Sequence, residues 1–498
     1  MELLSRSISD KKERPVRVVQ FGEGNFLRGF VDEMIDIANE KGCFDGDIVI
    51  VKPRPGSLAT LQEQECQYTV LLRGIENGQE VFERRIVTSV ADAVSVYEDY
   101  EAYLALARLD TLRFVVSNTT EAGIVYDPGD RPHMRPPVSY PGKLALFLYE
   151  RYLYFQGDIQ KGLIILPTEL IADNGGQLKA CVKEHAISWK LGTGFLNWLE
   201  EACIFCSTLV DRIVSGYPQE EADRLWEEWG YRDRAIVAGE PFALWVIESD
   251  RDISREFLPD RAGLPVIFTK DLDPWRQRKV RILNGAHTSF ALLSYLAGND
   301  FVGQSVQDGT VGGFIRKTIY EELMPTLPFP KKELEDFGAA VLDRFANPWV
   351  KHALLSISLN SVSKWRARCL PGVLDYVACM GHLPVCLTFS FAALLAFYTG
   401  SIVRDGALWG DRRGEAYPIR DEAWVLAFFA ENSKRPAEEY VRAVLENEAL
   451  FGPELLGVDG FFKRAAADLE EIRRSGMRRA LEKVCRRADT SAHLQGRM

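Results

Sequence analysis

The amino-acid sequence predicts an α/β N-terminal domain with extra strands, followed by a mainly α-helical C-terminal domain. Three observations favour this fold class. Short apolar runs alternate with helical patterns in the first half, strand signals almost vanish after about Trp275, and the first apolar run ends in a Gly-x-Gly turn. Strands that alternate with helices are typical of a parallel sheet with crossover helices. We therefore expect a nucleotide-binding domain over residues 1–270 and a helical substrate or catalytic domain over residues 271–498, with the boundary near 265–275.

The individual elements follow from apolar runs, helical periodicity and turn residues. We expect strands over residues 16–21, 47–52, 68–74, 112–118, 162–169 and 236–249, and helices near 26–40, 94–108, 142–154 and 174–191. The segment 58–92 breaks the alternation, which predicts extra, antiparallel strands. In the second half we expect helices over 275–298, 309–323, 331–345, 350–365, 384–399, 421–431, 436–447 and 459–487.

Composition and charge narrow the functional classes. Hydrophobic residues make up 47% of the chain and charged residues 26%, which is ordinary for a soluble globular protein. The formal net charge of -11 argues against nucleic acid as a partner. The N-terminus lacks the apolar core and cleavage site of a signal peptide. The nine cysteines are scattered, as in proteins of a reducing compartment, so we expect a cytoplasmic location.

Two further features concern membranes and metals. The stretch 383–400 carries no charge, but Pro384 and Gly400 stand where a helix of a soluble protein begins and ends, which favours a buried core helix over a membrane span. Cys203 and Cys206 form a lone C-x-x-C, and the six histidines show no paired spacing. We therefore expect neither a membrane partner nor a metal site.

The segment 20–30, QFGEGNFLRGF, predicts a nucleotide-binding loop. Gly22 and Gly24 follow an apolar strand and open a helix, so that their amides and the helix start could face a pyrophosphate. The third glycine of the usual fingerprint is replaced by Leu27. A structural turn is the alternative, because a lone Gly-x-Gly is weak evidence.

The next strand leaves the choice of cofactor open. An acid at its end would hold the adenosine ribose of NAD, whereas a cation there could hold the 2′-phosphate of NADP. The sequence at this point is VKPRPGS, with Lys52 and Arg54 and no acid. The two cations could equally belong to a solvated loop.

The segment RKVRILNGAHTSF (278–290) carries a candidate catalytic cluster. On an α-helix, Lys279, Asn284 and His287 fall at roughly 0°, 140° and 80° and share one broad face. A lysine can exchange a proton with a carbonyl group, an amide can stabilise the oxyanion and an imidazole can hold a neighbouring hydroxyl. The alternative is a solvated lysine, an amide inside the helix and a histidine satisfied in the core.

These two motifs together resemble the polyol-specific long-chain dehydrogenases, the family of mannitol dehydrogenases, fructuronate reductases and tagaturonate reductases. The resemblance spans nearly the whole chain, through VSNTTEAG (116–123), TELIADNGGQL (168–178), LVDRI (209–213), EPFALWVIE (240–248), RFANP (344–348) and NSVSKWRARCLP (360–371). It is strongest to the tagaturonate-reducing (altronate-oxidising) branch. It implies a Rossmann-type N-terminal domain, a helical C-terminal domain, NAD as cofactor and a mechanism without metal.

The resemblance also implies roles for individual residues. Phe26 and Arg28 belong to the family's own version of the glycine loop. Lys279 would be the general acid/base and His287 would orient the substrate. The remaining catalytic positions are two oxyanion amides and one acid, Asn284, Asn174 and Asp211. The predicted cofactor contacts are Gly22, Gly24, Asn25, Phe26, Arg28, Thr119, Thr120 and Glu121, although the last three could form a plain turn after their strand.

One departure from the family pattern bears on the substrate. Mannitol-type members have an arginine eight residues before the lysine of the S-x-K motif, where this chain has Ser356 ahead of Lys364. A uronate carboxylate needs a cation partner, and Lys364 and Arg368 would share a helix face while Arg366 points away. A solvated helix face is the alternative. We expect an NAD-dependent reductase of a keto-hexuronate, tagaturonate; fructuronate reductase, a mannitol-type polyol dehydrogenase and a catalytically silent NAD-binding sensor are the alternatives.

Overall fold

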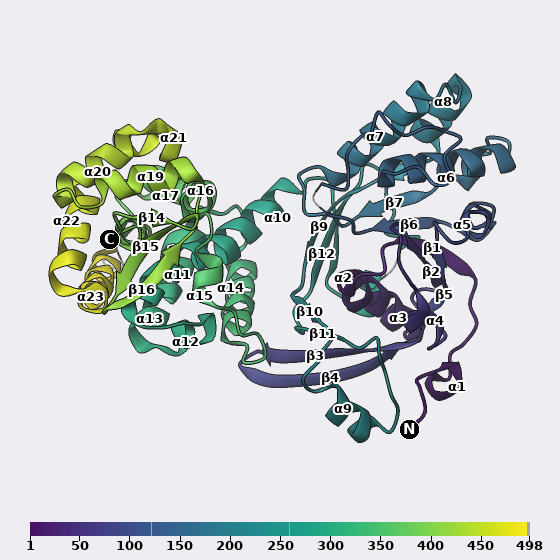
Figure 1. The fold of residues 1–498 in the computed structure, drawn as a ribbon, viewed down its shortest axis with the longest axis horizontal. Coiled ribbons are helices and arrows are strands. Elements are labelled where there is room, and N and C mark those ends of the chain that lie inside the picture. Colours follow the sequence, from purple (N-terminus) through teal and green to yellow (C-terminus); the bar gives the residue numbers. More distant parts are fainter. Residues whose placement is uncertain (121, 258, 496–498) are drawn as a thin grey trace. The chain divides into compact units, whose positions relative to one another are not determined.

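The computed structural model describes residues 1–120, 122–257 and 259–495 (Figure 1). The chain divides into two compact units, one of residues 1–74 and 80–273 and the other of residues 75–79 and 274–498. The first unit combines a parallel sheet with helices and smaller sheets, and the second is mainly helical. This confirms the predicted fold class.

The first unit is organised around a parallel sheet of six strands in the order β5-β2-β1-β6-β7-β8. Its strands are β1 (Val16–Phe21), β2 (Asp47–Lys52), β5 (Val90–Ser95), β6 (Phe114–Ser117), β7 (Ile164–Pro167) and β8 (Ile204–Phe205). The strand order reverses at β1, between β2 on one side and β6 on the other. In sheets of this type ligands bind beyond the carboxyl ends of the strands at that reversal.

Helices cover both faces of this sheet. They are α2 (Asn25–Leu27), the π-helical turn η1 (Arg28–Asp32), α3 (Glu33–Glu40), α5 (Tyr100–Leu106), α6 (Tyr140–Tyr154), α7 (Asn174–Ser188) and α8 (Thr193–Glu201). Alternate residues of β1 enter different cores: Val18 packs in one cluster, and Val19 and Phe21 pack in the other. Burial on both faces explains why these strands read as unbroken apolar runs.

Two expectations for this unit were wrong in detail. The helix expected over 94–108 begins only at Tyr100, because the preceding residues form β5 and pair with β2. The strand expected over 236–249 is two strands, β11 (Val237–Gly239) and β12 (Leu244–Glu248), which belong to different sheets. Pro241 lies between them and has no backbone N–H to continue a ladder.

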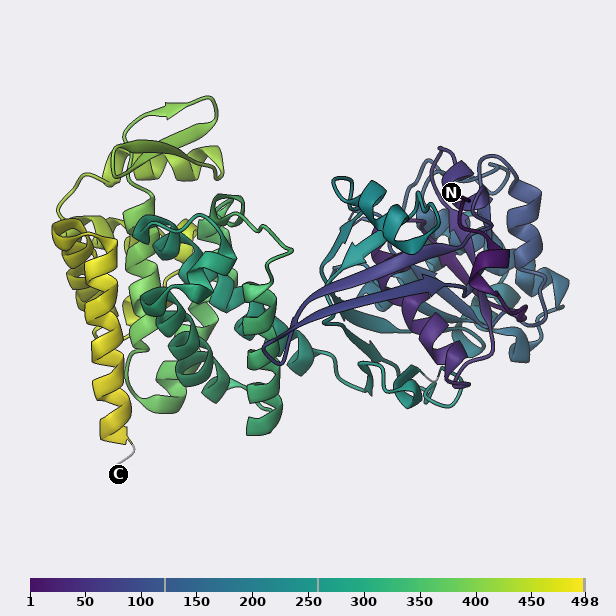
Figure 2. The same cartoon turned by 90° about the horizontal axis from the view of Figure 1, so that it is seen from below.

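The insertion between β2 and β5 contains the predicted extra strands. After the short helix α4 (Ala59–Gln62), β3 (Tyr68–Glu76) and β4 (Gln79–Val87) lie next to each other as a long pair (Figure 2). Asn77 and Gly78 join them with φ of 53° and 73°. A two-residue connection with both φ values positive is the usual turn of an antiparallel hairpin.

Short elements complete the first unit. Besides β3, β4 and β11, a four-stranded sheet contains β10 (Val214–Gly216), and β12 pairs with β9 (Ser207–Asp211) and β13 (Val266–Thr269). The remaining helices are α1 (Arg6–Ser9), η2 (Ile159–Lys161), α9 (Ala222–Trp229) and η3 (Pro259–Ala262).

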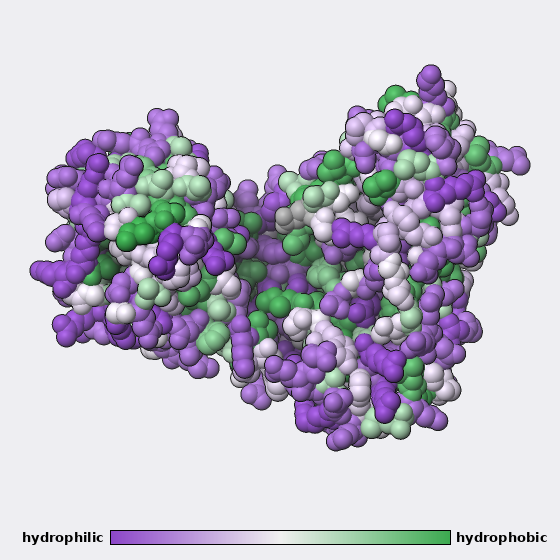
Figure 3. Space-filling view, viewed as in Figure 1, coloured by the Kyte–Doolittle hydropathy of each residue, from purple (hydrophilic) through white to green (hydrophobic). Residues whose placement is uncertain are grey.

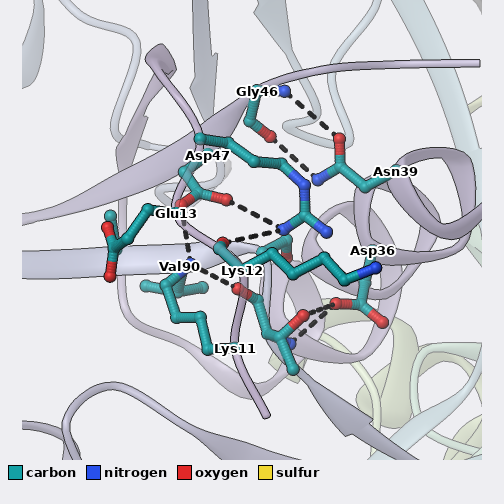
Figure 4. A network of polar contacts seen from close by, with 12 residues as sticks. Lys11, Lys12, Glu13, Asp36, Asn39, Gly46, Asp47 and Val90 are labelled. Carbon is teal, nitrogen blue, oxygen red and sulfur yellow. Dashed lines mark hydrogen bonds and ion pairs between the residues drawn. The ribbon is translucent and has the colours of Figure 1, made fainter. Parts of the chain in front are cut away.

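A buried polar network fixes the N-terminal segment to the amino end of β2 (Figure 4). Lys11 Nζ lies 2.6 Å from Asp47 Oδ2 and 2.7 Å from the Thr88 carbonyl oxygen, and neither side chain of the ion pair is exposed. Asn39 closes the turn before β2 with reciprocal hydrogen bonds to the backbone of Gly46. Removing one partner of a buried ion pair leaves an uncompensated charge. We therefore expect this network to hold the N-terminal segment against the start of β2.

The second unit is built from helices around the apolar helix α18 (Val385–Phe397). The others are α10 (Asp273–Arg278), the π-helical turn η4 (Lys279–Gly285), α11 (Ala286–Ala297), α12 (Val302–Gln307), α13 (Gly309–Lys317), the π-helical turn η5 (Thr318–Leu323), η6 (Met324–Thr326), α14 (Lys331–Ala346), α15 (Leu354–Ile357), α16 (Ser361–Arg368), α17 (Leu370–Met380), α19 (Ala423–Asn432), α20 (Ala437–Glu446), α21 (Glu448–Phe451), η7 (Glu454–Gly457), α22 (Phe461–Ser475) and α23 (Met477–Gln495). The uncharged stretch 383–400 thus supplies a 13-residue helix with almost every side chain buried. Within the described residues, no helix is both long and apolar enough to cross a membrane.

Three expectations for this unit needed correction. The helix expected over 350–365 is divided into α15 and α16 by Asn360, whose φ is 53°. The helix expected over 459–487 is divided into α22 and α23 at Gly476, whose φ is 82°. A three-stranded sheet of β14 (Val403–Arg404), β15 (Ala407–Arg412) and β16 (Glu415–Ile419) was not expected.

Three arginines that lie far from α11 in the sequence bind the carbonyl groups at its carboxyl end. Arg412 Nη1 donates to the carbonyl oxygens of residues 295 and 299, and Arg413 Nη2 and Arg478 Nε donate to the carbonyl oxygen of Ala297. Cations at this end of a helix satisfy its last carbonyl groups and interact favourably with its dipole.

The face seen in Figure 3 is mostly hydrophilic, with hydrophobic side chains in small groups.

Candidate active site

The loop after β1 has the backbone of a nucleotide-binding turn. Gly22 has φ of 126°, and a Cβ there would lie 3.2 Å from the Asn118 carbonyl oxygen, so a side chain would be strained and crowded. At Gly24 an added Cβ would meet no atom within 4 Å, which leaves its backbone open to a ligand. The helical turn α2 starts at Asn25, directly behind this open backbone. The loop therefore fits a pyrophosphate group.

The missing third glycine is replaced two residues further on. A Cβ on Gly29 would lie 2.8 Å from Val237 Cγ1, so only glycine lets the turn η1 approach β11 so closely. Leu27 is buried beside Gly22, and Phe26 stacks on Phe30 with ring centroids 5.0 Å apart. The role of a third glycine, close packing of helix against strand, is thus moved from position 27 to position 29.

Arg28 supports the loop from behind. Its Nε donates to the Glu23 carbonyl oxygen at 3.1 Å, its Nη1 to the Ala235 carbonyl oxygen at 2.6 Å and its Nη2 to Asn25 Oδ1 at 2.8 Å. All three nitrogens of the guanidinium group therefore bind protein oxygens. These contacts assign Arg28 to the shape of the loop, and its predicted contact with the cofactor remains a hypothesis.

A cavity of about 350 Å³ lies over the carboxyl ends of the parallel strands in the first unit. It is lined by the loop after β2, the loop after β6 and the start of α6, with residues Pro53, Arg54, Thr119, Thr120, Ala122, Gly123, Val125, Tyr126, Asp127, Pro128, Val138, Ser139, Tyr140 and Lys143. Two of the predicted cofactor contacts, Thr119 and Thr120, are in this lining, and Glu121 lies outside the described residues. The size and position of the cavity suit part of a dinucleotide.

Two ionisable groups were not expected from the sequence: Lys143, which lines this cavity, and Glu169, which binds the lining residue Thr119. Glu169 accepts hydrogen bonds from Thr119 N at 2.9 Å and Thr119 Oγ1 at 3.0 Å, and burial raises the pKa of its carboxyl group. Burial also lowers the pKa of the Lys143 ammonium group to about 8, and Arg54 contributes to the lowering. Glu169 thus fixes the position of Thr119, and the acid at the end of strand segment 162–169 was a signal for it.

The structure does not support the predicted oxyanion role of Asn174. Its Nδ2 lies 3.0–3.1 Å from the carbonyl oxygens of Pro167, Glu169 and Thr208, and its Oδ1 accepts from Thr208 N. An amide nitrogen has two hydrogens, so these three acceptors leave none for a substrate. Asn174 is also only 1% exposed, and it joins β7, α7 and β9. Asp211, the predicted acid, is the buried last residue of β9.

The predicted catalytic residues of the second unit lie on a π-helical turn instead of a regular α-helix. Lys279 begins η4 and Asn284 is its penultimate residue, while His287 follows in α11. In an α-helix, residues five apart are separated by roughly 140°, whereas the i→i+5 bonding of a π-helix brings them nearer to one face. In this geometry Asn284 is therefore expected on nearly the same side of the helix as Lys279. All three residues are half-buried.

The two arginines beside Lys279 are held by other groups. The Arg278 guanidinium lies 4.5 Å from the ring centroids of Trp275 and Phe337, and Arg281 Nη2 lies 2.6 Å from Asp375 Oδ2. Trp275 and Phe337 therefore keep Arg278 in an aromatic environment, where burial lowers its pKa to about 10.

His287 lies in an aromatic and basic environment. Its ring centroid is 4.7 Å from that of Phe345 and 5.0 Å from that of His352. Its Nε2 is buried and has no hydrogen-bond partner among the described residues. Burial, reinforced by His352 and by Arg368, Arg344 and Lys364, lowers its pKa to about 3. The imidazole is therefore neutral at physiological pH and has a nitrogen atom left to bind a ligand.

Helix α16 presents the predicted carboxylate ligands. Lys364 and Arg368 are half-buried one turn apart, while Arg366 is exposed and donates to the Ala449 carbonyl oxygen. The helix packs against η4 and α11, and Arg368 Nη1 lies 3.4 Å from Thr288 Oγ1. Burial lowers the pKa of both Lys364 and Arg368, as expected where cations gather away from water. Ser356 is exposed on α15.

Comparison with known proteins decides the family. The model of the mannitol dehydrogenase Rossmann domain matches residues 16–256, and that of the mannitol dehydrogenase C-terminal domain matches residues 271–473. The chain belongs to the mannitol dehydrogenase family. This dehydrogenase is accordingly an NAD-dependent oxidoreductase that acts on a CH–OH group.

Relatives and solved structures agree with this assignment. The dehydrogenase is 43% identical over 496 residues to an altronate oxidoreductase of Klebsiella pneumoniae (strain 342), with 97% of this chain and 100% of the relative covered. It is 42% identical over 493 residues to an altronate oxidoreductase of Escherichia coli O139:H28, with the same coverage. Two structures at 20% identity share the fold: D-sorbitol dehydrogenase, with a TM-score of 0.78 over 96% of this chain and 100% of that one, and Pseudomonas fluorescens mannitol 2-dehydrogenase with NAD and D-mannitol, with 0.67 over 98% and 100%.

Some groups in these sites escaped the sequence analysis because they meet only in the fold. Glu23 forms an ion pair with Lys52, and His352 and Arg344 act on His287 from separate segments. Only RFANP (344–348), quoted for its family resemblance, pointed to Arg344. Among the described residues, no group of three or more histidine, cysteine, aspartate or glutamate side chains is arranged to hold a metal ion.

Proposed function

We propose that this dehydrogenase reduces the keto-hexuronate tagaturonate to altronate with NADH. The observation that carries the proposal is the basic environment of His287, with Lys364 and Arg368 half-buried on one face of α16. A uronate differs from a plain ketose in its carboxylate, which such cations recognise. The near full-length similarity to altronate oxidoreductases supports the same substrate.

In this proposal each residue has a defined task. NADH, when bound, supplies the hydride for the keto carbon. Lys279 gives its proton to the carbonyl oxygen, and Asn284 donates a hydrogen bond to that oxygen while negative charge develops. The neutral His287 holds a substrate hydroxyl through Nε2, and Lys364 and Arg368 hold the carboxylate. Asp211 keeps its proposed place as an acid of the site, and Asn174 acts only in the scaffold.

The first unit supports the use of a dinucleotide. Gly22 and Gly24 would face the pyrophosphate, and the cavity lined by Arg54, Thr119 and Lys143 would hold part of the nucleotide. Asn25, at the start of α2, would offer its backbone amide to the same phosphates.

An NADH oxidation assay with tagaturonate, fructuronate and fructose side by side tests the proposal. We expect the highest kcat/KM with tagaturonate and little turnover of fructose. Faster reduction of fructuronate would identify a fructuronate reductase, and equal reduction of fructose would identify a mannitol-type enzyme. NADH binding without turnover of any of the three would favour a silent sensor.

A further inference from the structure

We propose that Glu23, the middle residue of the Gly-x-Gly turn, supplies the carboxylate that selects NAD(H) against NADP(H). This inference rests on the proposed use of a nicotinamide cofactor. An acid at the end of the second strand normally performs this selection, and the sequence VKPRPGS has none. The structure supplies a carboxylate at that position from the neighbouring loop.

The pairing of β1 and β2 places Glu23 there. The two strands are parallel, Phe21 is opposite Val51, and Gly22 N donates to the Val51 carbonyl oxygen at 3.0 Å. Glu23 therefore starts next to the carboxyl end of β2, where Lys52 is the last residue. The Glu23 carboxylate forms an ion pair with Lys52 Nζ through Oε1.

The cation of this pair is the better covered partner. The side chain of Lys52 is 11% exposed and that of Glu23 is 31% exposed. Gly56, with φ of 138°, turns the chain back over Lys52, and a Cβ on Gly56 would lie 3.0 Å from Lys52 Cε and 3.5 Å from Nζ. A ribose that approaches the end of β2 would therefore meet the carboxylate before the ammonium group.

Glu23 is also held in place and has an oxygen left for a ligand. Arg28 Nε binds its carbonyl oxygen, which fixes the backbone of the turn. Hydrogen bonds of the carboxylate within the described residues involve Oε1, so Oε2 can accept from a ribose hydroxyl. A 2′-phosphate at this place would bring its negative charge against that of Glu23, while Lys52 is already neutralised.

Equilibrium binding of NADH and NADPH, measured without substrate by the fluorescence of the bound cofactor, tests this inference. For Glu23→Gln we expect the Kd for NADPH to fall about tenfold or more, because repulsion is removed and Lys52 is released. The Kd for NADH should rise severalfold. Glu23→Asp keeps the charge and should retain most of the preference for NADH.

A double variant separates the two charges. In Glu23→Gln/Lys52→Met the gain in NADPH affinity should be lost, because the ammonium group that would bind the phosphate is gone. Lys52→Met alone leaves an uncompensated carboxylate, so it should weaken NADPH binding further and change NADH binding little. If Glu23→Gln does not fold, the Kd values of Lys52→Met for the two cofactors test the inference.

Glu256→Gln is the matched control. Glu256 is also ion-paired, but its partner Arg113 lies at the amino end of β6, away from the carboxyl ends of the strands. It should leave both Kd values unchanged. An unchanged NADPH-to-NADH ratio in Glu23→Gln would overturn the inference, as would a Lys52→Met variant that weakens both cofactors equally. A wild type that binds NADPH more tightly than NADH, and loses that preference only in Arg54→Ala, would overturn the inference and assign the selection to Arg54. If the wild type bound neither cofactor, the proposed function itself would fail.

Discussion

The glycine loop of the first unit and the α11–α16 region of the second unit balance their charges in different ways. In the loop, Lys52 is paired with Glu23, and Arg28 is bound to protein oxygens. Around His287, by contrast, Arg368 and Lys364 add to the effect of burial and help to lower the imidazole pKa to about 3. One region is neutralised internally and the other retains a positive field.

This difference indicates how each region recognises an anion. A loop with paired side chains offers backbone amides and a helix start to a phosphate, so its selectivity depends on fit and on one carboxylate. A region of gathered cations offers charge itself, which suits a carboxylate on an otherwise neutral sugar. If both proposals hold, residues of the first unit determine which nucleotide binds, and residues of the second unit determine the class of substrate.

The largest effect is expected for Lys279→Ala. Loss of a general acid/base should reduce kcat at least about a hundredfold. The Kd for NADH should stay nearly the same, because the proposed cofactor residues belong to the first unit. Stopped-flow turnover and fluorescence titration check the two parts, with exposed Lys351→Ala as the control. Near-normal turnover would remove Lys279 from the mechanism, and a large loss of NADH affinity would break the separation of the two regions.

The second effect concerns the carboxylate. A charge-assisted hydrogen bond is worth about 1.5–3 kcal/mol, so Lys364→Met should lower kcat/KM for tagaturonate roughly ten- to hundredfold. Arg366→Met, two residues away on the exposed side of α16, should change it little. Initial rates over a range of tagaturonate concentrations decide the point. Equal sensitivity of the two positions would show that charge on this helix acts at long range and does not contact the substrate.

The third effect is a packing test on the neutral region. In Gly29→Ala the added Cβ would lie 2.8 Å from Val237 Cγ1 and force the loop to shift. Overpacking of this kind costs about 1–3 kcal/mol, so we expect a lower melting temperature and weaker NADH binding. Val237→Ala in the same chain should restore both. Failure of this second change to compensate would mean that Gly29 serves another purpose than close packing.

The smallest effect is a pH dependence in the positive region. The pKa of His287 is about 3 in the folded chain and about 6.5 when unfolded, so the unfolded chain takes up the proton first as the pH falls. The free energy of unfolding therefore decreases as the pH falls below about 6.5, by up to about 1.4 kcal/mol per pH unit from this histidine. The melting temperature of the wild type should fall relative to that of His287→Gln between about pH 7 and pH 5. A difference in melting temperature that does not change with pH would show that the fold does not lower the pKa of His287.

Features that depend on local sequence were predictable. The bounds of β1 and β2 agree with the expected strands, because both are largely apolar runs that are buried on two faces and bounded by proline or glycine. The long helices α6, α7 and α14 followed from periodicity. The glycine turn was recognisable because a strand, two glycines and a helix start succeed one another within a few residues.

Features that depend on tertiary contacts were not predictable in this way. The π-helical turn at Lys279 has no signal in a pattern counted at 3.6 residues per turn. Asn174 looked like a catalytic amide, and only the positions of three distant carbonyl groups show that it is fully used. The acid absent from the end of β2 lies 29 positions earlier in the sequence, at Glu23, and reaches Lys52 only because β1 and β2 are neighbours.

The arginines at the end of α11 have a practical consequence for handling the protein. The family model ends at residue 473, which invites the view that the segment beyond it is an appendage. Arg478 at the start of α23 nevertheless bonds to Ala297, the last residue of the helix that carries His287, and to Asp308. Shortening the chain to the family boundary would remove this brace from the helix of the proposed substrate site. An affinity tag should therefore be added after α23, and α23 itself should be kept.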